Sequence, residues 1–285
     1  MSTEISSLYR YPIKSMGGHS LDSTSLDLLG LPGDRCWAVR DEERGGIKGG
    51  KRFATLMNLS ASLNTEPSTS QRSPEATITL QDGSTVLTSD EAVNDALSQA
   101  VGSPLSLWPL LPKEALEHYL RTPNNPDQDP EEGLREVFGR TKDEPLPDLS
   151  TFPAELMTYE SPPGTYFDAF PLLVMSQASL DSMQQASDTS TFDVRRFRPN
   201  IVMKTEESGF PEEAWAGKTA KLGSATIRFD MVCPRCVMTT HGFSDLPKDP
   251  KIMRQLVQQN GGNLGVYASV VEPGHIKLGD ELLIA

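Results

Sequence analysis

Short β-rich segments separated by turn residues constrain the fold of this chain more than any other feature. Residues 225–231 alternate strictly between apolar and polar side chains, which is the period of a strand with one buried face. Asp82-Gly83 lies between two apolar-rich stretches and predicts a tight hairpin. Further strand candidates are 5–13, 36–40, 76–80, 85–87, 172–175, 200–203, 266–271 and 276–284. This series predicts a mixed, β-rich (α+β) fold with a β-barrel-like core.

Helices are expected only at the edges of this core, because few stretches have helical periodicity. One apolar stripe spans residues 92–101, and a second follows Ser176, which is a suitable N-terminal cap. A third helix is expected between Asp249-Pro250 and Gly261-Gly262. Residues 134–138 look locally helical.

A Pro-, Asp- and Glu-rich stretch from about 121 to 164 interrupts the pattern. Such a composition buries little apolar surface, so a solvated linker is the favoured interpretation and a lid-like connector is the alternative. We therefore expect an N-terminal β-rich domain at 1–115, an acidic connector at 116–165 and a second domain at 166–285.

Charge and composition exclude several classes of function. The chain has 285 residues, with 26 basic and 39 acidic side chains and a formal net charge of −13. This charge argues against broad nucleic-acid binding and against binding to anionic membranes. No apolar stretch approaches 18 residues, the N-terminus lacks a secretory signal, and three cysteines make no disulfide framework. We expect a cytoplasmic protein with no membrane span and no nucleic-acid partner.

The motif Cys233-Pro234-Arg235-Cys236 carries the strongest chemical signal. Half of a zinc site would need two more ligands at paired spacing, and the remaining cysteine and histidines do not provide them. A dithiol redox pair would want a helix after the first cysteine, whereas 237–240 read as β-like. Two interpretations therefore stay open: one thiolate acts as a metal or cofactor ligand, or both cysteines are inert, buried apolar residues.

Basic residues gather in two further segments. Arg195, Arg196 and Arg198 lie within four positions of one another and lead into a predicted strand. Lys14-Ser15 ends the first predicted strand, and Arg35 enters the next. Lysine and arginine suit phosphate and carboxylate groups, although solvated surface is the common alternative. The local signal is weak in each case.

Taken together, these segments resemble the MOSC family, and more closely its two-part members that include the mitochondrial amidoxime-reducing component. The resemblance rests on the following stretches, in this order: YPIKS at 11–15, GDRCWAVRD at 33–41, FRPNIV at 197–202, Trp215, CPRCVMTT at 233–240 and IKLGDEL at 276–282. It runs from near residue 8 to the C-terminus and excludes the acidic middle. The fold that it implies is a β-barrel-like MOSC core with edge helices and an N-terminal MOSC β-barrel domain.

The resemblance implies a molybdenum cofactor, in which the metal is held by the dithiolene of a phosphorylated pterin and by one protein cysteine. That cysteine corresponds to Cys236. The residues that match the family's cofactor contacts are Lys14, Ser15, Arg35, Arg198, Asn200, Arg235, Thr239 and Thr240. His241 and Asp245 follow the ligand turn and are candidate proton donors.

The activity that the resemblance implies is the reduction of small N-hydroxylated or N-oxide substrates. Because Cys236 is assigned to the metal, only Cys36 and Cys233 remain. We therefore expect no iron–sulfur cluster on this chain, and electrons from a separate donor protein. The alternative is a sulfur carrier or molybdenum-cofactor carrier of the same superfamily. Ala169-Phe170 and the loop 241–247 depart from the family's pattern, which leaves the substrate open.

Overall fold

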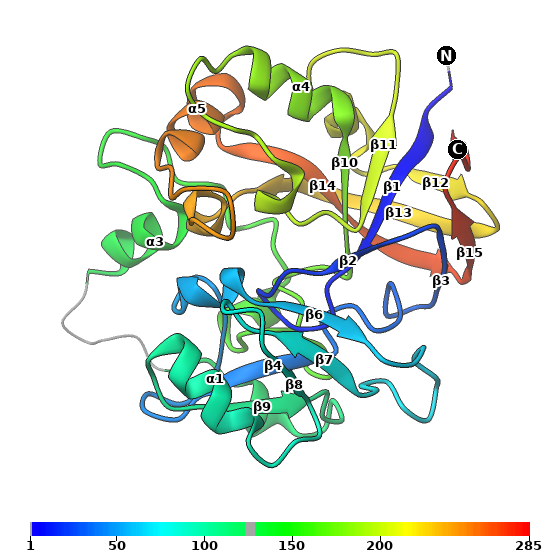
Figure 1. Cartoon of the computed structure of the whole chain (residues 1–285). Coiled ribbons are helices and arrows are strands. Elements are labelled where there is room, and N and C mark those ends of the chain that lie inside the picture. The colour runs from blue at the N-terminus through cyan, green and yellow to red at the C-terminus, as the bar shows by residue number, and fades with distance from the viewer. Residues whose placement is uncertain (1, 123–128) are drawn as a thin grey trace.

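The computed structural model describes residues 2–122 and 129–285, and its largest element is an eight-stranded sheet (Figure 1). The strand order in this sheet is β16-β12-β13-β14-β10-β11-β1-β2. Its strands are β1 (Glu4–Arg10), β2 (His19–Leu21), β10 (Leu172–Ser176), β11 (Ile201–Lys204), β12 (Thr219–Leu222), β13 (Ala225–Pro234), β14 (Asn263–Glu272) and β16 (Leu282–Ile284).

Three smaller sheets complete the strands. They consist of β5 (Ile47–Lys48), β4 (Trp37–Asp41) and β9 (Leu105–Pro109); of β6 (Ser60–Leu63), β7 (Ala76–Thr79) and β8 (Thr85–Leu87); and of β15 (Gly274–Lys277) with β3 (Ser23–Leu26). The α-helices are α1 (Val93–Val101), α2 (Leu116–Tyr119), α3 (Pro130–Phe138), α4 (Gln177–Gln185) and α5 (Lys251–Asn260). Short 3-10 helices are η1 (Ala54–Asn58), η2 (Ala154–Met157), η3 (Val194–Arg196), η4 (Pro211–Trp215) and η5 (Val237–Thr240).

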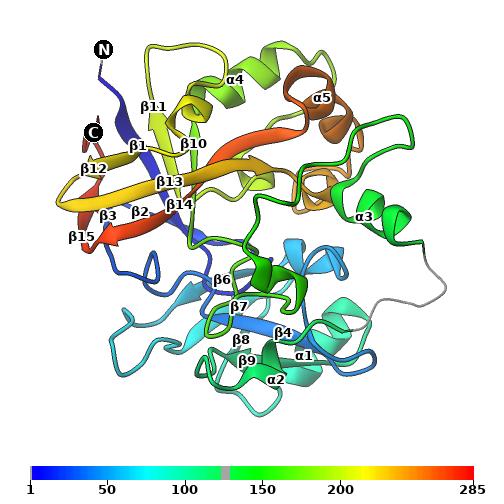
Figure 2. The ribbon, with the colours of Figure 1, turned by 180° about the vertical axis from the view of Figure 1, so that it is seen from behind.

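The predicted β-rich fold is confirmed. The large sheet curls, α4 and α5 pack on one of its faces, and the β5-β4-β9 and β6-β7-β8 sheets gather with α1 on the opposite side of the molecule (Figures 1 and 2). Ser176 caps α4 as expected, because its hydroxyl accepts a hydrogen bond from the Ser179 amide at 3.0 Å. The segment 276–284, expected as one strand, forms two, because the chain turns at Gly279 with a φ of +82°.

Strand β10 is buried on both faces, which explains its uninterrupted apolar run. Leu172 and Val174 pack into the core inside the curled sheet, together with Phe229 of β13. Leu173 and Met175 pack on the other face against residues of α4 and α5. The sheet thus separates two apolar layers.

The first strand of the chain belongs to the same sheet as the C-terminal strands. β1 pairs antiparallel with β11, and Leu8 lies opposite Ile201. β3 likewise pairs with β15. These pairings bring the N-terminal segment against the C-terminal half, while the division into 1–115, 116–165 and 166–285 stays a prediction.

Part of the predicted acidic connector packs against the rest of the molecule. Its local helix is confirmed as α3, which Asp129 caps by accepting from the Glu131 amide at 2.8 Å. Tyr119 of α2 is fully buried. Within the described residues, every helix is too short or too polar to cross a membrane.

Replacing Phe229 by alanine should destabilise the fold by about 3–5 kcal/mol, because its ring is fully buried and packs on Trp215 at a centroid distance of 5.3 Å. The free energy of unfolding from urea titrations measures this. Leu283→Ala is the control, since that side chain is 59% exposed and its loss should cost less than about 0.5 kcal/mol. Equal effects of the two changes would contradict the described core.

Candidate functional site

The turn that carries Cys236 lies between β13 and η5. The Thr239 hydroxyl donates to the Cys236 carbonyl at 3.1 Å, and the Thr240 hydroxyl donates to the Val237 carbonyl at 2.7 Å. Such side-chain bonds to the local backbone stabilise a tight turn. The β-like conformation expected for 237–240 is therefore wrong.

The two cysteines of the motif differ in their surroundings. Cys233 is buried and Cys236 is partly exposed, and both are free thiols. Burial raises the pKa of the Cys233 thiol, which accepts a hydrogen bond from Arg235 Nη1 at 3.1 Å. The described residues contain no group of three or more His, Cys, Asp or Glu side chains placed to hold a metal ion. Cys236 is thus the thiol of the pair that a ligand from outside can reach.

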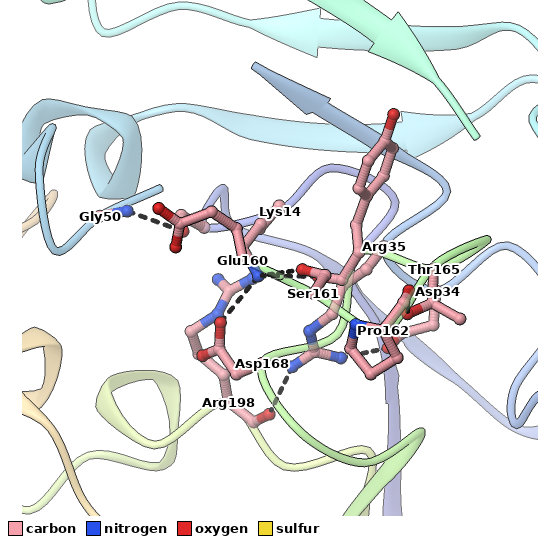
Figure 3. A network of polar contacts seen from close by, with 12 residues as sticks. Lys14, Asp34, Arg35, Gly50, Glu160, Ser161, Pro162, Thr165, Asp168 and Arg198 are labelled. Carbon is pink, nitrogen blue, oxygen red and sulfur yellow. Dashed lines mark hydrogen bonds and ion pairs between the residues drawn. The ribbon is translucent and has the colours of Figure 1, made fainter. Parts of the chain in front are cut away.

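Lys14 lies at the centre of a polar network (Figure 3). Its Nζ donates to the Tyr166 carbonyl at 2.8 Å, to Asp168 Oδ1 at 2.7 Å and to the Ser161 hydroxyl at 3.5 Å. Burial opposes ionisation of Asp168, but the charges of Lys14 and Lys51 prevail and hold its pKa well below its ordinary value. Asp168 is therefore a carboxylate at neutral pH.

Backbone strain concentrates around this network. Among the described residues, four non-glycine residues have positive φ: Ser15 at 69°, Arg35 at 47°, Arg198 at 56° and Ser244 at 48°. Three of them are predicted cofactor contacts, and the fourth lies in the loop after the Cys236 turn. Such conformations disfavour ordinary side chains and cluster where a site must be held in a set geometry.

Two arginines share the ring of Tyr11. The guanidinium carbon of Arg198 lies 4.3 Å from the ring centroid, and that of Arg35 lies 5.3 Å from it. Arg35 is ion-paired with Asp34, whereas Arg198 Nη2 is buried without a hydrogen-bond partner in the described structure. Burial, reinforced by the charge of Arg35, lowers the pKa of Arg198 to about 10. Arg198 thus remains a cation at neutral pH and has an unused donor.

Lys51 joins the network, although sequence reasoning passed over it. The charge of Asp168 raises the pKa of Lys51 most, and Cys236 adds to the effect. The Lys51 residue itself is exposed, and its loop approaches the network closely. The preceding glycines allow this approach. A Cβ on Gly49 would lie 2.5 Å from the Ser15 hydroxyl, and one on Gly50 would lie 2.8 Å from the Met238 methyl carbon. The Gly49-Gly50-Lys51 sequence is a usable signal for this close approach.

Asn200 has a different place from the other predicted contacts. Its Oδ1 accepts from the Leu173 amide at 3.1 Å, and its Nδ2 donates to the Tyr9 carbonyl at 3.4 Å. The fully buried amide therefore ties β10 to β1. A direct contact of Asn200 with a cofactor stays a prediction.

The two candidate proton donors differ in charge state. Asp245 is exposed and ion-paired with Arg195 at 2.8 Å, and the hydrogen bond from that arginine lowers its pKa to about 2. It is therefore ionised at neutral pH and poorly suited to donate a proton. His241 has a buried Nε2 without a partner in the described structure, and burial lowers its pKa. His241 is thus neutral at pH 7, and its Nε2 is free of hydrogen bonds to the described residues.

Arg196 holds the loop that carries His241. Its buried guanidinium donates to the backbone carbonyls of Thr191, Thr239, His241 and Pro247 at 2.9–3.4 Å. Hydrogen bonds from one buried guanidinium to several backbone carbonyls hold a loop more firmly than hydrogen bonds that are exposed to water. Of the three neighbouring arginines, Arg196 therefore shapes the site and Arg195 lies on the surface.

Replacing Arg196 by methionine should cost about 2–4 kcal/mol of folding free energy, because buried carbonyls lose charge-assisted hydrogen bonds. Arg195→Met, at the adjacent exposed position, should cost less than about 1 kcal/mol. Urea titrations of both variants measure the difference. Similar losses would show that Arg196 does not hold the loop.

His241 should make the fold sensitive to acid. Because its pKa is lowered in the folded state, the unfolded chain binds more protons below the ordinary histidine pKa of 6.5, and stability falls as the pH drops through that range. In His241→Gln, the loss of unfolding free energy between pH 7 and pH 5.5 should be smaller than in the unmodified protein. An unchanged pH dependence would contradict the assignment.

Comparisons with known proteins agree with this architecture. The model of the MOSC N-terminal beta barrel domain matches residues 2–103, and that of the MOSC domain matches residues 162–283. The chain is 24% identical over 300 residues to mitochondrial amidoxime reducing component 2 of Bos taurus, covering 97% of this chain and 81% of that one. The human protein of that name is 32% identical over 128 residues, which cover 40% of this chain and 37% of that one.

Among solved structures, the YUAD protein from Bacillus subtilis aligns over 100% of this chain and 96% of its own, with a TM-score of 0.44 and 11% identity. The two domain matches together span most of the chain, on both sides of the acidic middle, and include the Lys14, Arg35 and Cys236 segments. The chain therefore belongs to the MOSC family and combines an N-terminal MOSC β-barrel domain with a MOSC domain.

Proposed function

We propose that this protein binds a molybdenum cofactor at Cys236 and reduces small N-hydroxylated or N-oxide substrates with electrons from a separate donor protein. The observation that carries the proposal is a basic site inside an acidic chain. Its basic residues come from distant segments. Lys14 contacts Asp168 directly, and Arg35 and Arg198 both lie against the Tyr11 ring. Arg235 contacts Cys233 in the motif that ends at Cys236. Names of relatives in the same family support the reaction class.

The donor set fits an anionic, phosphate-bearing ligand. Arg198 Nη2 and Arg235 Nε are buried and lack hydrogen-bond partners in the described structure. Neither arginine forms an ion pair with a described carboxylate. Buried donors that stay unpaired are costly, so an added anion would relieve both. Lys14, Arg35 and Arg198 would hold the phosphate end, and the partly exposed Cys236 thiol is a suitable soft ligand for the metal.

When bound, the group supplies two-electron redox chemistry at the metal, which removal of oxygen from an N–O bond requires. The residues of this chain would orient the group and balance its negative charge. Arg235 places positive charge next to Cys236, and Thr239 and Thr240 hold the turn that presents the thiol. The strained backbone at Ser15, Arg35 and Arg198 keeps the basic side chains in position before any ligand binds.

Reduction of an N–OH group to N–H consumes two electrons and two protons and releases water. We assign the proton relay to His241, whose Nε2 lacks a described partner, rather than to the ionised Asp245. Because only Cys36 and Cys233 remain once Cys236 is assigned to the metal, too few thiolates are left for the usual cluster, and we expect the electrons from another protein.

Elemental analysis of protein made in a cofactor-competent host tests the proposal, followed by a benzamidoxime reduction assay with an artificial electron donor. The unmodified protein should contain about one molybdenum per chain. Cys236→Ser should lose activity by about 100-fold or more, since it replaces the only thiol ligand. Cys233→Ser is the matched control and should keep most of the metal, because that thiol is buried beside Arg235.

Absence of molybdenum and pterin from such a preparation would overturn the proposal. A persulfide on Cys236 without molybdenum would instead identify a sulfur carrier, which the exposed free thiol also permits.

A further inference from the structure

The end of the acidic segment is firmly attached to the MOSC core. Arg254 of α5 forms an ion pair with Glu144 and also donates to the Gly139 carbonyl. Arg135 of α3 donates to the carbonyls of Thr141 at 2.5 Å and of Glu144 at 2.8 Å. We call residues 130–144 the α3 segment. Arg135 stabilises the segment internally, and Arg254 attaches it to α5, so this part of the acidic stretch is held against the core.

The α3 segment touches the Cys236 turn. Gly139 ends α3 in a left-handed conformation with a φ of +61°, and a Cβ there would lie 3.5 Å from the Val237 Cα. Val237 directly follows Cys236. The segment therefore forms one wall of the turn, as the position of α3 beside the C-terminal half also indicates (Figure 2).

Arg140 extends from this wall into the protein. Only 6% of the residue is exposed. Its Nη1 donates to the Phe138 carbonyl at 2.9 Å and touches the Met253 sulfur, and its Nη2 donates to the Gly262 carbonyl at 3.4 Å. The same Gly262 carbonyl accepts the Arg235 amide at 2.9 Å. Arg140 thus lies directly behind the backbone of the Cys233–Cys236 motif.

The charge of Arg140 is not neutralised by a described carboxylate. Glu144 is nearby, but it is ion-paired with Arg254. Arg140 Nε is buried and lacks a partner in the part of the chain that the structure describes. Burial lowers the pKa of Arg140, while Glu144 and the Cys236 sulfur both favour its charged form. A buried guanidinium without a carboxylate partner is costly, and its hydrogen bonds to the Phe138 and Gly262 carbonyls offset part of that cost.

We propose that Arg140 is a positioning residue of the Cys236 site, which holds the Cys233–Cys236 motif through the Gly262 carbonyl and adds a positive charge behind the Cys236 sulfur. Its role toward a bound metal rests on the proposed function, whereas its role in holding the turn does not. Arg140 lies outside both ranges that the family models match, so the family match does not account for this contact.

Amide hydrogen exchange of the full-length, cofactor-free protein tests the holding role. Arg140→Met should speed exchange of the amides of residues 235–240 by about tenfold, the factor expected from losing one charge-assisted hydrogen bond. Arg228→Met is the matched control, because that side chain is 57% exposed on the same strand as Cys233 and pairs with Asp230. Unchanged exchange at 235–240 in Arg140→Met would overturn the holding role.

The molybdenum content after gel filtration tests whether the positive charge of Arg140 helps to retain the metal. Arg140→Met should retain about tenfold less metal than the unmodified protein, and Arg140→Lys should restore most of it, because lysine keeps the charge. If Arg140→Lys retained as little molybdenum as Arg140→Met, the proposed contribution of the Arg140 charge would be overturned. Full retention in Arg140→Met would overturn it as well.

The two proposals fail in different ways. If the unmodified protein carries no molybdenum, the proposed function fails, and the exchange experiment still decides whether Arg140 holds the turn. If Arg140→Met does not fold, which far-ultraviolet circular dichroism detects, Arg254→Met replaces it. That change detaches the α3 segment from α5 and should speed exchange at 235–240, and its failure to do so would overturn the proposal.

Discussion

The pairing of β1 with β11 is the interaction on which the candidate site depends. It places the end of the first strand, and the stretch after it with Lys14 and Ser15, beside the segment that carries Arg198. Asn200 reinforces this pairing, because its buried amide bonds to the Leu173 amide of β10 and to the Tyr9 carbonyl of β1. Without this arrangement, the cations of the N-terminal segment would lie far from Cys236.

The electrostatics of the protein follow from the same arrangement. The net charge of −13 describes the chain as a whole, whereas Lys14, Lys51, Arg35 and Arg198 surround Asp168. Asp168 balances part of this positive charge and stays ionised as a result. Repulsion among the remaining cations is tolerated because carbonyls, the Tyr11 ring and Asp34 each hold one or more of them.

Residue type and order were enough to predict the β-rich fold and the helix that Ser176 caps. The role of the basic residues toward Cys236 came from the family resemblance and stays a prediction. Other features depend on contacts between distant segments, which a local sequence pattern does not reveal. Lys51 reaches the site because two glycines let its loop approach Ser15 and Met238. The turn at 237–240 has β-branched residues, yet two threonine hydroxyls stabilise a 3-10 helix there. The sequence favoured Asp245 as a proton donor, because its ion pair with Arg195, fifty positions away, could not be seen in the local pattern.

The order of strands in the large sheet also bears on how the protein is made. Lys14 is synthesised more than two hundred residues before Cys236, and the sheet that joins them needs strands from both ends of the chain. Contacts of such long sequence separation form late, because the chain must lose the conformational entropy of a large loop before these contacts can stabilise it. A ribosome-bound fragment that lacks the last strands therefore lacks part of the sheet that supports the candidate site. The arrangement of basic residues around Asp168 is complete only once strands from both ends of the chain have been synthesised and paired.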